Sequence, residues 1–181
     1  MSSISFDIVK IKGIRSYKVA KSSQVAIFCS EWHKDVTLYM LEQCESTLHS
    51  LGVRKKFIHK YSVQGALELP LGAQFLLNTK PDEYDAIICI GCVIKGDTPH
   101  FEYVCQGVSS GILKVSLKYN IPIISGVLTT FNKKQAEERI DGSVGNKGAE
   151  IAIAAISMIA LKKDIQEKFK KQENSKNQEG K

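Results

Sequence analysis

The sequence has no run of 18 consecutive apolar residues, and its mean hydropathy is only −0.12. A membrane-spanning helix needs about 20 such residues, so we expect no membrane span. The first residues, MSSISFD, do not combine a basic stretch with an apolar core, and we therefore expect no secretory leader. With 181 residues, the chain has the length of one ordinary domain.

Several patterns that mark common cofactor and catalytic sites are missing as well. The chain has neither the G-x-x-x-x-G-K-[ST] spacing of a P-loop nor the G-x-G-x-x-G of a dinucleotide-binding fold. A Ser, His and Asp in the order of a hydrolase triad and a cluster of metal ligands are also absent from the sequence. A catalytic or binding site in this chain must therefore use other residue patterns.

Cysteine occurs in an odd number. The five are Cys29, Cys44, Cys89, Cys92 and Cys105, and reduced cytosolic thiols are the simplest interpretation. Cys89 and Cys92 have C-x-x-C spacing, but a zinc site needs a second ligand pair and a redox pair is expected at a helix N-terminus. Both lie inside an apolar run, which favours burial as small hydrophobic side chains.

The net charge of +6 and the isoelectric point near 9.0 point to a polyanionic partner, but the excess lies at the two ends. Residues 1–21 carry +4 and 162–181 carry +3, whereas 22–161 carry −1. We predict one domain over 1–168, followed by a disordered Lys/Gln/Glu-rich tail over 169–181. A nucleic-acid arm is the alternative, but neither arginines nor aromatic residues alternate with its lysines, so we expect no nucleic-acid partner.

Short apolar runs alternate with helical periodicity along the chain. The predicted strands are 25–29, 57–63, 85–90 and 121–127, and the predicted helices are 35–51, 69–77, 102–119, 133–140 and 147–168. Such alternation predicts an α/β fold, a flavodoxin-like three-layer α/β/α sandwich around a four-stranded parallel core sheet. Residues 1–20 are predicted to form an extended N-terminal arm, of which residues 5–20 are predicted to add an edge strand.

In open parallel sheets, ligands bind outside the carboxyl ends of the strands. The segments that follow the four predicted strands are 30–33, 64–68, 91–100 and 129–132. They contain the only Trp, two of the four His and several Gly. The sequence therefore predicts a site at this edge of the sheet.

Three of these residue types have a clear chemical use. Trp32 offers a flat face on which a planar ring can stack, although an aromatic residue that covers the core is the alternative. His100 can give and take a proton at neutral pH, or it can cap the helix that follows. The amides of Gly96, Asp97 and Thr98 can cradle an anion, with the Thr98 hydroxyl as a further donor.

Other candidates are less distinctive. Arg139 is one of only three arginines and its fork suits a phosphate, but a solvated helix face explains it as well. Glu68 can bind hydroxyl groups or can serve as a helix cap. His49 and His59 fall within a predicted helix and a predicted strand, so we interpret both as structural.

Several segments in register resemble one known family, 6,7-dimethyl-8-ribityllumazine synthase. The segments are GALELP at 65–70, YDAIICIGCVIKGDTPHFEYV at 84–104, GVLTT at 126–130, QAEER at 135–139 and GNKG at 145–148. The resemblance covers residues 24–160. It implies the penultimate step of riboflavin biosynthesis, in which 5-amino-6-(D-ribitylamino)uracil and 3,4-dihydroxy-2-butanone 4-phosphate condense with release of phosphate and water. No cofactor and no metal are implied.

The resemblance also implies a role for individual residues. His100 would move protons, Trp32 would stack on the pyrimidine ring, and His33 would lie close to that ring. The remaining substrate-binding positions are the backbone of Val93 and Ile94 for the polar edge of the ring, Ala66, Leu67 and Glu68 for the ribityl chain, and Lys95, Gly96, Asp97, Thr98 and Arg139 around the phosphate. Lys147 matches a further lysine of the family's site.

Family active sites lie between subunits of a homo-pentamer, so Ser125, Arg139 and Lys147 would come from the adjacent chain. Some members assemble twelve pentamers into an icosahedral capsid, and the short connection over 140–146 resembles the capsid-forming type. The resemblance further implies a cytoplasmic protein with a functional link to riboflavin synthase.

The chain departs from the family pattern at four positions. Leu67 and Ser125 stand where an aromatic residue is common, His33 replaces a usual Asn, and Lys95 replaces a common Arg. Two other functions remain open on the sequence. A flavodoxin-like module that binds a flavin or nucleotide without catalysis would not need His100 together with Arg139, and a nucleic-acid-binding protein would bind through its basic ends in a salt-sensitive way.

Overall fold

The computed structural model describes the backbone of residues 14–179 and the side chains of residues 18–170. The strands are β1 (Val25–Ser30), β2 (Ile58–Val63), β3 (Ala86–Ile94) and β4 (Ile123–Thr130). The helices are α2 (Ile14–Ser22), α3 (Lys34–Ser50), α4 (Leu69–Thr79), α5 (His100–Tyr119), α6 (Lys133–Glu138) and α7 (Lys147–Glu179). Two single 3₁₀ turns, η1 (Lys55–Phe57) and η2 (Ala66–Glu68), precede β2 and α4.

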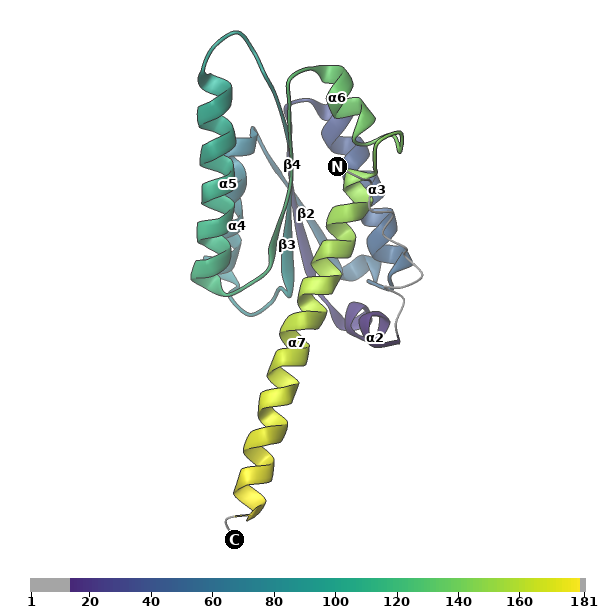
Figure 1. Ribbon diagram of the computed structural model, residues 1–181, viewed down its shortest axis with the longest axis vertical. Helices are drawn as coiled ribbons and strands as arrows, with labels where there is room; N and C mark the ends of the chain where they lie inside the picture. The colour runs from purple at the N-terminus through teal and green to yellow at the C-terminus, as the bar shows by residue number, and fades with distance from the viewer. Residues whose placement is uncertain (1–13, 180–181) are drawn as a thin grey trace.

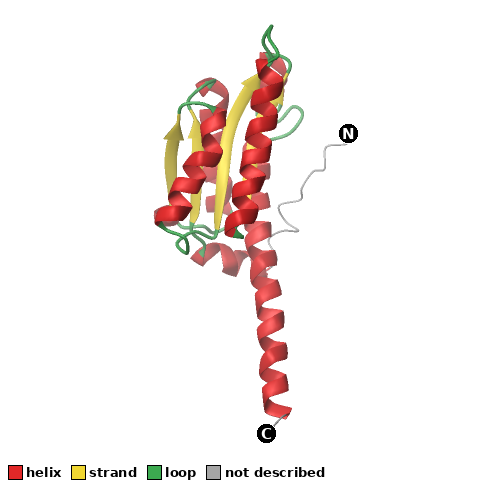
Figure 2. Cartoon of the chain, turned by 90° about the vertical axis from the view of Figure 1, so that its left-hand side faces the viewer, coloured by secondary structure: helices red, strands yellow, loops and turns green. Residues whose placement is uncertain are grey.

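The four strands form one parallel sheet in the order β2-β1-β3-β4. The arrowheads in Figure 2 all point to the same end of the sheet. This order is that of the flavodoxin-like doubly wound fold, and the prediction of a four-stranded parallel core sheet is confirmed. The chain reverses its winding direction between β1 and β3, which opens a crevice at their carboxyl ends.

The sheet separates two hydrophobic cores. Alternate residues of β1 point to opposite faces, so Ile27 belongs to one core and Phe28 to the other. Helices α3 and α7 cover the first face together with α2 and α6, whereas α4 and α5 cover the second (Figure 1). Since both faces are covered, β3 reads as an uninterrupted apolar run whose first seven residues are buried.

The helices form where apolar residues recur at helical spacing. In α3, Val36, Met40, Cys44 and Leu48 are spaced four residues apart, so they share one face, and all four are buried. Gly52 follows the helix with a φ of 105°, a conformation that side chains with a Cβ rarely adopt. In α4, Pro70 lies in the first turn, where its missing N–H costs no hydrogen bond.

Two predictions for the chain ends are corrected by the structure. Residues 14–20 are not extended but belong to α2, in which Ala20 is fully buried against the first core; the rest of the predicted arm, 1–13, lies outside the described residues. The predicted disordered tail continues α7 as a helix through Glu179 (Figure 1). Lys, Glu and Gln are good helix formers, and extending a helix that packing has already nucleated costs little.

The site end and the tail end of the molecule are opposite. In Figure 2 the strand arrowheads point away from the C-terminal half of α7, which projects beyond the sheet. Within the described residues, no helix has the length and apolar character needed to cross a membrane.

Candidate active site

The turn after β1 is tied to the turn after β2. The backbone N–H of Glu31 donates to the carbonyls of Val63 (2.9 Å) and Gln64 (3.2 Å). Its carboxylate accepts a hydrogen bond from the Ser62 hydroxyl at 2.5 Å and pairs with Lys34 at 2.8 Å. Lys34, and then Ser62, hold the pKa of Glu31 below its usual range. These contacts fix the segment that carries Trp32 and His33.

His33 has an unusual backbone conformation. It is the N-cap of α3 and lies in the left-handed region, with φ 56° and ψ 50°. Its side chain makes no capping hydrogen bond with the helix. Such a conformation costs a non-glycine residue about 1–2 kcal/mol.

Glu68 has the capping role that was one of its two predicted uses. One of its carboxylate oxygens, Oε2, accepts the backbone N–H of Gly65 at 2.9 Å. This bond closes η2 and holds Ala66 and Leu67 at the mouth of the crevice. A Cβ at Gly65 would lie 3.0 Å from this same Oε2 and in ordinary contact with the Trp32 ring, at 3.8 Å.

The segment after β3 leads from Lys95 to the start of α5. The backbone N–H of Lys95 donates to the carbonyl of Thr130 at 2.9 Å, which continues the pairing of β3 with β4. Its ammonium group pairs with Glu102 at 3.2 Å and lies 5.6 Å from the centre of the Phe131 ring. A hydrogen bond from its own backbone N–H, and then Lys95, lower the pKa of Glu102.

These segments enclose an open pocket of about 350 Å³ at the carboxyl ends of β1 and β3. Ten of the fifteen predicted site residues line it: Trp32, His33, Ala66, Leu67, Glu68, Val93, Ile94, Gly96, Thr98 and His100. Lys95 and Asp97 belong to the same loop but are not among the lining residues. The pocket size falls in the range that small-molecule sites occupy.

Five further lining residues were not predicted as site residues: Gln64, Gly65, Cys92, Phe101 and Val104. Three of them directly precede predicted site residues: Gln64 and Gly65 come before Ala66, and Cys92 comes before Val93. The expectation that ligands bind at the carboxyl ends of parallel strands could therefore have identified them. Phe101 and Val104 lie on the first turn of α5, one and four residues after His100. They face the pocket only because of the direction in which α5 leaves the loop, which the sequence does not reveal.

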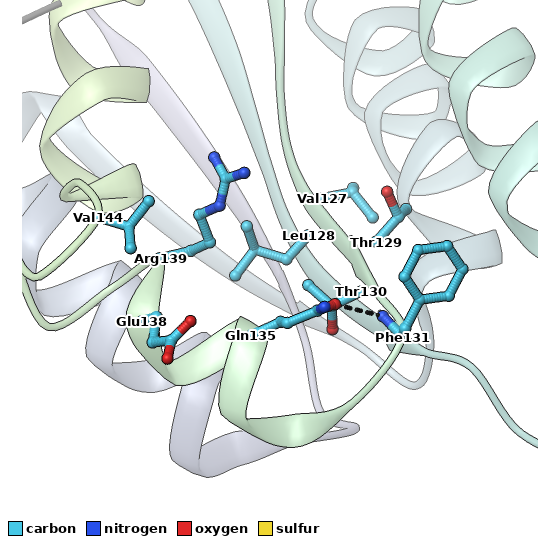
Figure 3. A pocket seen from close by; sticks show the side chains of 9 residues that line it. All are labelled: Val127, Leu128, Thr129, Thr130, Phe131, Gln135, Glu138, Arg139 and Val144. Carbon is cyan, nitrogen blue, oxygen red and sulfur yellow. Dashed lines mark hydrogen bonds between the residues drawn. The ribbon is translucent and has the colours of Figure 1, made fainter. Parts of the chain in front are cut away.

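Arg139 lines a separate pocket of about 510 Å³ (Figure 3). Residues 127–131 at the end of β4 form one side, and Gln135 and Arg139 project from the other. The turn into α6 is capped reciprocally, since Asn132 accepts the N–H of Gln135 and Gln135 accepts the N–H of Phe131, both at 2.9 Å. Among residues 18–170, the Arg139 side chain forms no ion pair or hydrogen bond, so its fork is available to an anion.

Ser125 and Lys147 line a third pocket, of about 410 Å³, between β4 and α7. The ammonium group of Lys147 pairs with Glu150 at 3.2 Å. Residues of β4, the last strand of the sheet, line both this pocket and that of Arg139. Within one chain, the structure therefore does not bring Ser125, Arg139 and Lys147 into the pocket of His100.

The cysteines behave as buried apolar groups. All five are free thiols, and Cys89 and Cys92 are buried as predicted. Burial raises the pKa of both to about 12, so neither is a thiolate at neutral pH. In the part of the chain that the structure describes, no three His, Cys, Asp or Glu side chains are grouped as metal ligands.

Comparisons with known proteins agree on one family. A sequence profile described as 6,7-dimethyl-8-ribityllumazine synthase matches residues 22–163. Proteins with that name from Parabacteroides distasonis and Cytophaga hutchinsonii are 46% and 47% identical over 140 residues, which is 77% of this chain and 86% and 87% of theirs. The protein of that name from Coxiella burnetii is 46% identical over 145 residues, 80% of this chain and 95% of its own.

Proposed function

The chain belongs to the 6,7-dimethyl-8-ribityllumazine synthase family, and from that premise we propose that the 350 Å³ pocket is where its reaction takes place. The protein is a transferase of riboflavin biosynthesis. It condenses 5-amino-6-(D-ribitylamino)uracil with 3,4-dihydroxy-2-butanone 4-phosphate to 6,7-dimethyl-8-ribityllumazine, with release of phosphate and water. The observation that carries the proposal is the convergence of ten predicted site residues, from three separate segments, on this one pocket.

The pyrimidine substrate is placed by the walls of the pocket. Trp32, which is 59% exposed, offers its face to the ring, and His33 lies beside it at the rim. The backbone of Val93 and Ile94 at the end of β3 would bind the polar edge of the ring. Ala66, Leu67 and Glu68 would contact the ribityl chain, for which Glu68 has one carboxylate oxygen besides the one that caps η2.

His100 is the proposed proton-transfer residue. It is the first residue of α5, and it lines the pocket with an imidazole that can accept a proton at one step and return it at another. Imine formation, loss of phosphate, tautomerisation and ring closure all move protons, so one such group is used repeatedly. The loop of Lys95, Gly96, Asp97 and Thr98 would hold the phosphate ester next to it.

A second subunit would complete the site. Arg139, Ser125 and Lys147 lie at the free edge of β4, outside the His100 pocket of their own chain, which supports a homo-pentamer in which each site takes these residues from a neighbour. The short connection over 139–146 supports the further proposal that pentamers assemble into an icosahedral capsid. Five free thiols support a cytoplasmic location, and the product implies a functional link to riboflavin synthase.

The test is to incubate the purified protein with both substrates and follow lumazine absorbance and phosphate release against a sample without protein. We expect His100→Ala to lower kcat by about 10²-fold or more, the usual contribution of a positioned acid–base group, while assembly is retained. Arg139→Ala should mainly raise the KM of the butanone phosphate. Wild-type rates for both variants would refute the assignment of the site.

A further inference from the structure

The four histidines of the chain fall into two groups. His49 Nδ1 lies 2.9 Å from the carbonyl oxygen of Val53, and His59 Nδ1 lies 2.7 Å from the hydroxyl of Tyr84. These contacts agree with the structural role predicted for both. His33 and His100 line the same pocket, and among residues 18–170 neither ring forms a hydrogen bond or ion pair. Two imidazoles without a structural task therefore share the pocket.

The side chain of His33 takes no part in capping α3. His33 lies in the left-handed region, which Asn, Asp and His adopt more often than most other non-glycine residues. Its carbonyl oxygen accepts the N–H groups of Val36 and Thr37, both at 2.9 Å, so the backbone joins residue 33 to the helix. The imidazole makes no capping hydrogen bond. The side chain is therefore left for the pocket that it lines.

The other charged groups around His33 already have partners. On the turn and on α3, Glu31 pairs with Lys34, and Asp35 pairs with Lys133 of α6 at 2.6 Å. Two more acidic groups belong to the neighbouring segments: Glu68, which lines the pocket and accepts the N–H of Gly65, and Glu102 of α5, which pairs with Lys95. The thiol of Cys92 stays protonated because burial raises its pKa to about 12. Unlike these carboxylates, the two imidazoles have no partner among residues 18–170, which leaves both free to contact a substrate in the pocket.

We propose that His33 is a second proton-transfer residue, which works with His100 from the other side of the substrate. This inference rests on the proposed function of the pocket. In the dehydration of the carbinolamine, one imidazolium donates a proton to the departing hydroxyl, which leaves as water. The other imidazole accepts the proton of the N–H group as the C=N bond forms. One ring has then lost a proton and the other has gained one, so the net charge of the pair is unchanged. In the next step the two rings can exchange the roles of donor and acceptor.

The decisive variant is His33→Asn, because Asn tolerates the left-handed backbone and keeps hydrogen-bonding groups but cannot titrate near neutral pH. We expect kcat to fall about 10- to 100-fold. The loss should be smaller than for removal of the only acid–base group of a site, because His100 remains. The KM of the ribitylaminouracil should change less than about threefold. The dependence of kcat on pH should lose one ionisation relative to the wild type.

The matched control is His49→Asn, which removes an imidazole outside the pocket and should leave kcat and its pH dependence as in the wild type. An unchanged kcat and pH profile for His33→Asn, or an effect confined to KM, would overturn the inference, since the side chain would then only bind. Failure of the proposed function looks different. In that case His100→Ala would retain the wild-type rate, or the wild-type protein would form no lumazine.

Discussion

Burial, rather than a nearby charge, sets the state of the thiols in the core. Cys44 and Cys89 are fully buried on opposite faces of the sheet, and desolvation raises the pKa of each from its ordinary value near 9 to about 12. Between pH 9 and pH 12, these thiols therefore remain protonated in the folded protein but have lost their protons in the unfolded chain. The free energy of unfolding should therefore be unaffected by these thiols below pH 9 and should fall as the pH rises above it.

We expect a loss of about 1 kcal/mol per buried thiol between pH 9 and pH 10. The measurement is urea unfolding at both pH values under reducing conditions. Cys89→Ala should show a smaller loss over this interval, whatever its stability at pH 7, because its own thiol no longer titrates. Cys105→Ala is the matched control, since Cys105 is only partly buried and should contribute less. Equal losses in the wild type and in Cys89→Ala would contradict the argument.

At the residue scale, the sequence indicated which groups could do chemistry but not which of them are free to do it. Trp32 and His100 follow predicted strands. Because ligands of open parallel sheets bind at the carboxyl ends of the strands, this position alone predicted that both residues lie at the pocket. The capping role of Glu68, by contrast, became evident only from its carboxylate, which accepts the N–H of Gly65 at 2.9 Å. The free ring of His33 likewise became evident only when its contacts could be compared with those of His49 and His59.

At the scale of elements, one glycine lets two helices touch. Gly148 is the second residue of α7, and a Cβ there would lie 2.5 Å from the carbonyl oxygen of Met40 and 2.7 Å from the Cβ of Gln43, both on α3. The nearest obstacle is backbone, which cannot rotate away. Any larger residue must therefore push α3 and α7 apart and loosen the core between them.

We expect Gly148→Ala to lower the free energy of unfolding by about 1–3 kcal/mol, the usual cost of forcing extra volume into a packed interior. Gly96→Ala is the matched control, because a Cβ at Gly96 meets no atom within 4 Å and should leave stability nearly unchanged. Chemical denaturation of both variants beside the wild type decides the point. A Gly148→Ala variant as stable as Gly96→Ala would show that the two helices can separate without cost.

The elements themselves were mostly predictable, and the exceptions have physical reasons. Buried strands and amphipathic helices have distinct apolar periods, which is why all four strands and five of the helices were found, with ends shifted by up to four residues at the strands and by more at α7. Helix α2 was missed because only tertiary contacts, such as the burial of Ala20, distinguish it from an extended arm. The tail was assigned to disorder on composition, although the same lysines and glutamates also favour a helix.

At the scale of the whole molecule, the predicted site residues of one chain line separate pockets. His100 and Arg139 line pockets that have no residue in common, the first at the crevice between β1 and β3 and the second at the end of β4. The strand ends predicted the place of His100, whereas Arg139 falls in the predicted helix 133–140 and was assigned to a neighbouring chain only through the family resemblance. That β4 is the outermost strand of the sheet became evident only from the structure.

The proposed division of the site between neighbouring subunits leads to a result that is not expected of a site within one subunit. When the butanone phosphate is kept well below the raised KM expected for Arg139→Ala, His100→Ala and Arg139→Ala should each be nearly inactive alone. When the two variants are co-expressed, or unfolded together and refolded, roughly a quarter of the interfaces will unite an intact His100 with an intact Arg139 if subunits mix at random around a ring. Lumazine formation should then recover to about that fraction of the wild-type rate, whereas separately assembled variants mixed afterwards should stay inactive. No recovery in co-assembled particles would mean that His100 and Arg139 act within the same chain.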